Sequence, residues 1–134
     1  MIVLDTDIVI WILRGNQAIV AAIDRLVSKE SVGISTITVA EIYKNIFPIE
    51  MPAVEDFIFY QELFPVSLDI AKIAGLYWNQ YHQGLKNLSL TDCLIAATAK
   101  IHRAALATMN IKHFPMDDIS LFNPAAGTMI KRKK

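Results

Sequence analysis

The chain of 134 residues has very little cysteine, no long apolar run and no surplus of positive charge. Its single cysteine, Cys93, cannot form an internal disulfide or supply the paired thiols of a structural zinc site, so we expect a small packing residue. No stretch approaches the roughly 20 apolar residues of a membrane span. The first apolar run has no basic leader before it and contains Asp5. We therefore expect a cytoplasmic protein that does not bind membranes.

The charge of the chain argues against a general affinity for nucleic acid. Thirteen Lys and Arg residues balance thirteen Asp and Glu residues, and four of the basic residues form the run 131–134. Without that run, nine basic residues face thirteen acidic ones, a net charge of −4. Nucleic-acid binding usually requires a basic surface, so any such activity must depend on a local site. We expect 131–134 to be a disordered basic tail rather than an arm that holds RNA.

The apolar content bounds the organisation of the chain. Hydrophobic residues make up 54% of the sequence and charged residues 19%, which suffices for a well-packed core. The length fits one compact domain, which we place at residues 1–130. A small domain leaves much of its surface exposed, so some of these apolar residues should form a surface for a partner or a second copy of the chain.

Short apolar stretches alternate with stretches of helical periodicity along the whole sequence. This alternation predicts an α/β fold, a sandwich in which helices flank a mainly parallel central sheet. Sites in such sheets form at the carboxyl ends of the strands. The expected strands are 2–4, 32–35, 64–67, 104–108 and 119–122, and the expected helices are 8–13, 17–29, 38–46, 53–63, 68–82 and 89–103.

Three widely separated acids, Asp5, Glu41 and Asp92, fall just after strands or in the first turns of helices. If the sheet gathers them at one edge, their mutual repulsion requires a cation or raised pKa values. Magnesium prefers oxygen ligands and is commonly held by one or two carboxylates together with a substrate phosphate. The arrangement therefore indicates chemistry on phosphodiesters.

Glu41, Asp92 and a further acid, Asp7, close beside Asp5, also have structural explanations. Asp7 could be the N-cap of the first helix. Glu41 could complete a capping box that begins at Thr38. Asp92 could lie in a first helical turn simply because the helix dipole favours acids there. These explanations do not account for Asp5 at the end of an apolar strand, or for three acids placed where a sheet could bring them together.

Two further polar residues follow the strand predicted at 104–108. Asn110 comes directly after its end, and His113 lies in the short turn before Pro115. His113 is a candidate general base, although a surface or helix-capping histidine is the more usual interpretation.

Four segments resemble the PIN-domain ribonucleases, and among them the VapC-type toxins of type II toxin–antitoxin systems. They are LDTD at 4–7, STITVAEI at 35–42, TDCLIAATA at 91–99 and ATMNIKHF at 107–114. Their order, spacing and apolar surroundings agree with the family, and the resemblance covers nearly the whole chain. It implies a PIN-like three-layer sandwich.

The resemblance also implies which residues form the site. Asp5, Glu41 and Asp92 would coordinate Mg²⁺, with Mn²⁺ as a substitute. The hydroxyls of Thr6 and Thr108 would support these acids. Many relatives carry a fourth acid where Asn110 stands, so the number of metal ions stays open. The remaining acids to consider are Asp7, Asp117 and Asp118, of which the last two are expected to be turn residues.

The function implied is that of a magnesium-dependent endoribonuclease that acts as a toxin. A metal-activated water would cleave RNA phosphodiester bonds and leave 5′-phosphate and 3′-hydroxyl ends. The implied partners are the RNA substrate, a VapB-type antitoxin and a second copy of the chain, with the apolar stretch 42–64 as the expected antitoxin dock. No Arg lies between Gly84 and Asp92, so we expect a weaker or differently specific grip on RNA.

Two alternatives compete with this interpretation. A phosphatase of the haloacid dehalogenase type would explain DTDIV at 5–9. Its later motifs would have to be Thr108, Lys112, Asp117 and Asp118, which are too crowded to end separate strands. A PIN-like binding module without turnover would suit the acidic body and the missing arginines, but it leaves the three acids without a purpose.

Overall fold

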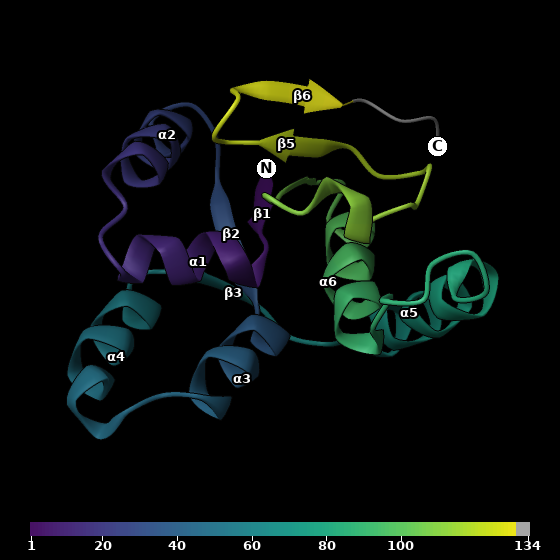
Figure 1. The fold of residues 1–134 in the computed structure, drawn as a ribbon, viewed down its shortest axis with the longest axis horizontal. Helices are drawn as coiled ribbons and strands as arrows, with labels where there is room; N and C mark the ends of the chain where they lie inside the picture. The colour runs from purple at the N-terminus through teal and green to yellow at the C-terminus, as the bar shows by residue number, and fades with distance from the viewer. Residues whose placement is uncertain (131–134) are drawn as a thin grey trace.

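The first strand, β1 (Ile2–Leu4), is fully apolar and fully buried at the centre of the sheet. The computed structural model describes residues 1–130, and their strands form one six-stranded sheet (Figure 1). From edge to edge, the strands are β3 (Glu62–Phe64), β2 (Val32–Ser35), β1, β4 (Ala105–Ala107), β5 (Leu121–Asn123) and β6 (Thr128–Ile130). β6 is antiparallel to β5, and the other neighbouring pairs are parallel.

Helices cover both faces of this sheet. The helices α1 to α4 lie on one side, and α5 and α6 lie on the other (Figure 1). They are α1 (Thr6–Leu13), α2 (Gln17–Val27), α3 (Thr36–Lys44), α4 (Met51–Phe59), α5 (Leu68–Tyr81) and α6 (Leu90–Ile101), with 3-10 turns at η1 (Pro48–Glu50) and η2 (Ile111–His113). The predicted α/β fold with a mainly parallel central sheet is confirmed.

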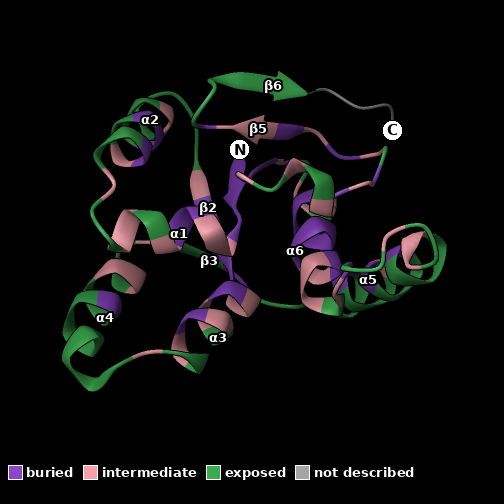
Figure 2. Cartoon of the chain, viewed as in Figure 1, coloured by how far each residue is buried: buried purple, intermediate pink, exposed green. Residues whose placement is uncertain are grey.

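Two hydrophobic cores meet at β1. Successive side chains of a strand point to opposite faces, so Val3 packs into the core under α5 and α6, while Ile2 and Leu4 pack into the core under α1 to α4. Burial follows the same division, with β1 and much of α6 buried and the outer helices exposed along their solvent sides (Figure 2). Cys93 is a fully buried free thiol in the first of these cores, as expected of a packing residue.

Several predicted boundaries were wrong. The helix expected at 53–63 is α4, which begins earlier because Pro52 sits in its first turn, where no backbone N–H is required. The strand expected at 64–67 ends at Phe64, because β3 pairs with β2 only from Glu62 to Phe64. The sequence pattern did not predict β6, whose three residues are all exposed. The basic run expected to be a tail, 131–134, lies outside the described residues.

Within residues 1–130, no single helix has the length and apolar character needed to cross a membrane. The consecutive helices α1 and α2 reach that length and composition together, but their axes are bent by 115°.

Gly33 in β2 marks a close approach between neighbouring strands. A Cβ added there would lie 2.6 Å from the backbone oxygen of Glu62 and 2.6 Å from Cε2 of Phe64. Both atoms belong to β3, and the backbone oxygen cannot move without disturbing the strand pairing. The sheet therefore requires a residue without a side chain at this position.

We expect Gly33→Ala to lower the free energy of unfolding by about 1–3 kcal/mol through overpacking, measured by urea denaturation. Gly75→Ala is the matched control, because a Cβ on Gly75 in α5 meets no atom within 4 Å. This control should raise stability by about 0.5–1 kcal/mol, since alanine favours helix more than glycine does. Equal stabilities for wild type and Gly33→Ala would contradict the close approach of β2 and β3 at Gly33.

Candidate active site at the carboxyl edge of the sheet

Asp5 lies where β1 ends and α1 begins, and its carboxylate is held on both oxygens. Oδ1 accepts a hydrogen bond from the backbone N–H of Thr6 at 2.8 Å, and Oδ2 accepts one from the hydroxyl of Thr108 at 2.8 Å. The side chain is only 5% exposed. Asp5 is thus the N-cap of α1, and the prediction that Asp7 might be that cap was wrong.

Glu41 reaches the same edge from the middle of α3. The hydroxyl of Thr6 donates to Oε1 of Glu41 at 2.6 Å and lies 3.1 Å from the hydroxyl of the buried Thr38. The capping-box interpretation of Thr38 and Glu41 was wrong, because α3 begins two residues earlier and Ser35 is its N-cap. Thr38 instead contributes a buried hydroxyl to the polar cluster.

Asp7 also points into this cluster, from the first turn of α1. Its Oδ2 accepts hydrogen bonds from the backbone N–H of Met109 at 3.1 Å and from Nδ2 of Asn110 at 3.0 Å. Its Oδ1 is buried and has no hydrogen-bond partner within residues 1–130. The backbone N–H of Asn110 donates in turn to the hydroxyl of Thr108 at 2.9 Å, so the segment after β4 is tied to both Asp5 and Asp7.

Asp92 is half-buried in the first turn of α6, as predicted, and its backbone N–H donates to the hydroxyl of the N-cap Ser89 at 3.0 Å. Burial raises the pKa of Asp92, the charge of His113 lowers it, and the charge of Glu41 raises it. The charge of His113 also lowers the pKa of Asp7. Residues from four separate parts of the chain therefore share one electrostatic environment.

Burial is the main cause of the raised pKa values in this cluster. It raises the pKa of Asp5 well above its ordinary value, and the nearby charge of Asp7 raises it further. Burial likewise raises the pKa values of Asp7 and Asp92. Carboxylates that are desolvated and close together favour either a proton or a bound cation.

The cluster suits a hard divalent cation in its chemistry. Its acceptors are carboxylate and hydroxyl oxygens, ligands that Mg²⁺ and Mn²⁺ prefer, and Oδ1 of Asp7 has no hydrogen-bond partner within residues 1–130. Among residues 1–130, however, no three Asp, Glu, His or Cys side chains already stand in a metal-binding arrangement. A bound ion would thus have to draw the acids closer together.

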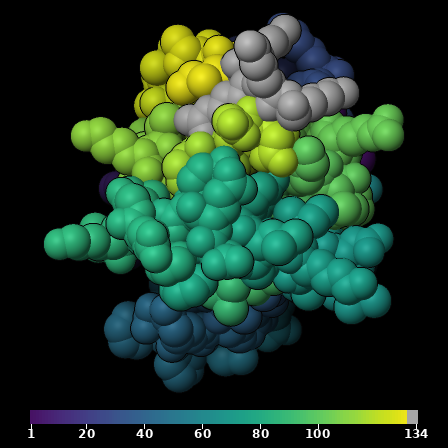
Figure 3. Space-filling model, turned by 90° about the vertical axis from the view of Figure 1, so that its right-hand side faces the viewer, coloured from purple at the N-terminus to yellow at the C-terminus, as the bar shows by residue number. Residues whose placement is uncertain are grey.

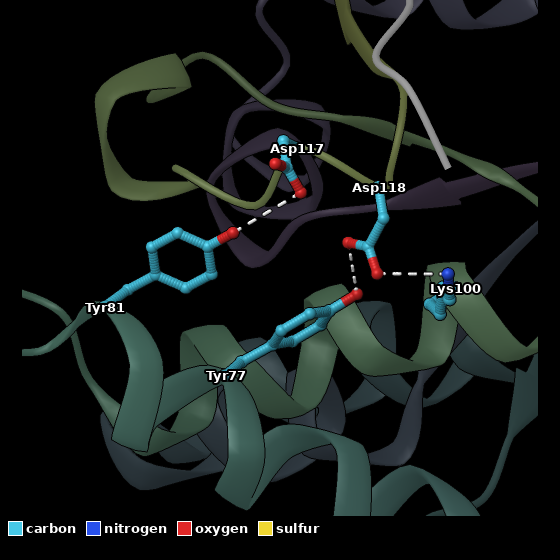
Figure 4. Close-up of polar contacts among 5 residues, drawn as sticks. All are labelled: Tyr77, Tyr81, Lys100, Asp117 and Asp118. Atoms are coloured by element: carbon cyan, nitrogen blue, oxygen red, sulfur yellow. Dashed lines mark hydrogen bonds and ion pairs between the residues drawn. The ribbon is translucent and has the colours of Figure 1, made fainter.

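Asp117 and Asp118 form a separate network (Figure 4). The Tyr77 hydroxyl donates to Oδ1 of Asp118 at 2.7 Å, and Nζ of Lys100 lies 3.0 Å from Oδ2 of the same residue. The Tyr81 hydroxyl makes a long contact of 3.5 Å with Asp117. Both acids lie in a turn, as expected, and they fasten the segment before β5 to α5 and α6.

Sequence reasoning left open whether Asp7 joins the site, and it assigned Thr38 to capping and so missed its place in the cluster. A signal for Asp7 was available: once Asp5 is taken as the N-cap, Asp7 becomes the second residue of the helix and faces the same end of the sheet. No comparable signal existed for Thr38, because its contact with Thr6 joins residues 32 positions apart.

Comparison with known proteins agrees with this architecture. The PIN domain matches residues 2–116. Ribonuclease VapC10 of Mycobacterium tuberculosis is 37% identical over 119 residues, which cover 87% of this chain and 87% of the relative. Ribonuclease VapC19 of the same organism is 32% identical, with coverages of 87% and 94%. A toxin-antitoxin complex from Klebsiella pneumoniae superposes with a TM-score of 0.74 at 25% identity, covering 92% of this chain and 98% of that one.

The matches extend over most of the chain and over most of each relative. The PIN-domain match includes the strand ends that carry Asp5 and Thr108. The resemblance to PIN-domain ribonucleases noted in the four sequence segments is confirmed at the level of the family. The chain belongs to the PIN-domain family.

Proposed function

We propose that this chain is an endoribonuclease toxin of the VapC type that depends on magnesium. The observation that carries the proposal is the convergence of Asp5, Glu41 and Asp92 at one edge of the sheet, in a family whose relatives here are named ribonucleases. The hydroxyls that hold Asp5 and Glu41, and the raised pKa of Asp5, support it further.

Asp5, Glu41 and Asp92 are the proposed ligands of Mg²⁺, with Mn²⁺ as a substitute. When bound, the ion would polarise a phosphoryl oxygen and lower the pKa of a coordinated water. The chain's own groups position these acids: Thr108 and the N–H of Thr6 immobilise Asp5, and the Thr6 hydroxyl holds Glu41. Glu41 is half-buried at the rim of the cluster and is the residue proposed to orient the attacking water.

The rival phosphatase interpretation finds no support. Two of the acids that it requires, Asp117 and Asp118, are committed to Tyr81, Tyr77 and Lys100. The family assignment also points away from it. A binding module without turnover has the same fold as the nuclease, so an activity measurement must separate the two.

The proposed partners are an RNA substrate, a VapB-type antitoxin and a second copy of the chain. The similar structure from Klebsiella pneumoniae is a toxin-antitoxin complex, which supports the antitoxin. The stretch 42–64 exposes large apolar side chains, as an antitoxin dock requires. They are Phe47, Ile49, Met51, Phe59, Tyr60 and Leu63. Sedimentation as a monomer at micromolar concentration would contradict the homodimer.

We expect Asp5→Asn and Asp92→Asn to lower the rate of cleavage of mixed RNA in Mg²⁺ by at least about 100-fold, because each removes a proposed metal ligand. Asp117→Asn is the matched control, since this exposed acid contacts Tyr81 outside the cluster. Gel analysis of RNA with purified protein, in magnesium and then in chelator, measures the effect. Wild-type cleavage by Asp92→Asn would refute the assignment, and a folded wild type that leaves all RNA intact would favour the binding module.

We expect the free energy of unfolding in chelator to fall as the pH rises above 3.8, the ordinary pKa of an aspartate, more steeply in wild type than in Asp5→Asn. A carboxyl whose pKa is raised by folding binds its proton more tightly in the folded chain, so deprotonation at higher pH destabilises the fold. Urea denaturation at stepped pH measures both curves. If the two curves run parallel, the Asp5 carboxyl has no raised pKa in the metal-free protein.

We expect expression of the chain alone to arrest growth, and a co-expressed VapB-type antitoxin to relieve the arrest. Phe59→Ser combined with Tyr60→Ser should weaken this relief at least tenfold in the antitoxin dose required, because exposed aromatic anchors commonly dominate such interfaces. Leu76→Ser is the control, because Leu76 is an exposed apolar residue of α5, which lies on the other side of the sheet from α4 (Figure 1). Harmless expression of soluble, folded protein would contradict the toxin assignment, and full relief of the double variant would contradict this dock.

A further inference from the structure

We propose that Asp7 is a fourth carboxylate ligand of the metal, held in place by Asn110 and by the backbone N–H of Met109. This inference rests on the proposed function, because it adds a ligand to the site assigned to Asp5, Glu41 and Asp92. It comes from the unequal surroundings of the two oxygens of Asp7: Oδ2 accepts two hydrogen bonds, and Oδ1, although buried, accepts none within residues 1–130.

The hydrogen bonds by which Asp7 joins two parts of the fold do not involve Oδ1. Oδ2 alone joins α1 to the segment after β4, through Met109 at 3.1 Å and Asn110 at 3.0 Å. A buried acceptor left without a partner is destabilising, because it has lost its hydrogen bonds to water without replacement. The first turn of a helix favours an acid, but that preference does not require an oxygen to be buried unpartnered beside a second acid.

An asparagine at position 7 could make the same two hydrogen bonds and would leave no buried acceptor without a partner. Its amide oxygen could accept from both Met109 and Asn110, and its NH₂ group would take the place of Oδ1. The carboxyl groups of Asp5 and Asp7 lie within hydrogen-bonding reach, so this NH₂ group could donate to Asp5. The chain instead carries a carboxylate that repels Asp5, and this conflict is removed either by a proton that the two carboxyls share or by a cation bound between them.

The geometry around Asp7 also gives Asn110 a role. Its side-chain N–H groups donate, which orients a carboxylate but adds no negative charge to the cluster. Asn110 follows β4, whereas Asp7 belongs to α1. The fourth carboxylate of the site thus comes from the helix that begins at Asp5, and Asn110 is its positioning residue.

Binding of Mn²⁺ to the purified full chain, measured by titration calorimetry without RNA, tests the inference. We expect Asp7→Asn to raise the Kd at least tenfold and to leave the stability in chelator equal to or above that of wild type. Asn110→Ala is the second variant, and because it leaves Asp7 loosely held it should raise the Kd about tenfold. Asp5→Asn should remove binding, and Asp117→Asn should bind as wild type does.

The outcomes separate this inference from the proposed function. If Asp5→Asn loses Mn²⁺ while Asp7→Asn and Asn110→Ala bind as tightly as wild type, Asp7 is only a structural acid and the inference is overturned. If wild type binds no Mn²⁺, the metal site itself fails, and the inference fails with it. Should Asp7→Asn not fold, an unchanged Kd for Asn110→Ala overturns the inference.

Discussion

The hydrogen bonds on the Asp5 carboxylate are the interaction on which the rest of the site depends. They join the end of β1 to the start of α1 through Thr6 and to the end of β4 through Thr108. The same Thr6 then holds Glu41, so a single helix start fixes acids from two distant segments. Because the carboxylate is buried, its pKa is raised and the arrangement is poised to accept a cation or a proton.

The fold tolerates this buried charge because the stabilising contacts lie elsewhere. The two hydrophobic cores on either side of β1 are built from apolar residues, and the acids lie beyond the ends of the strands rather than between sheet and helices. The network of Tyr77, Lys100 and Asp118 fastens α5, α6 and the segment before β5 away from the acids. Acidic chemistry and structural stability are thus assigned to different parts of the molecule.

The fold and two of the acids at this edge, Asp5 and Asp92, could be predicted because they leave local signals. An apolar strand that stops at Asp5, and helix starts before Asp92, are visible in short stretches of sequence. β6 left no such signal, since all its residues are exposed and its pairing with β5 depends on a turn. Whether Asp7 joins the cluster stayed open for a different reason: its partners, Met109 and Asn110, are more than 100 positions away, and the same residue type is common at helix caps.

The pairing of β1 with β4 also governs when the site can exist during synthesis. Ile2 pairs with Ala105. The carboxylate of Asp5 accepts a hydrogen bond from the hydroxyl of Thr108, which lies 103 positions later in the chain. A ribosome adds about 5–20 residues per second, so for many seconds the nascent chain has its first acid but neither the central strand pairing nor Thr108. A chain proposed to cut RNA is consequently assembled on an RNA machine before its site is complete, and the buried contact that holds Asp5 can form only after Thr108 has been synthesised.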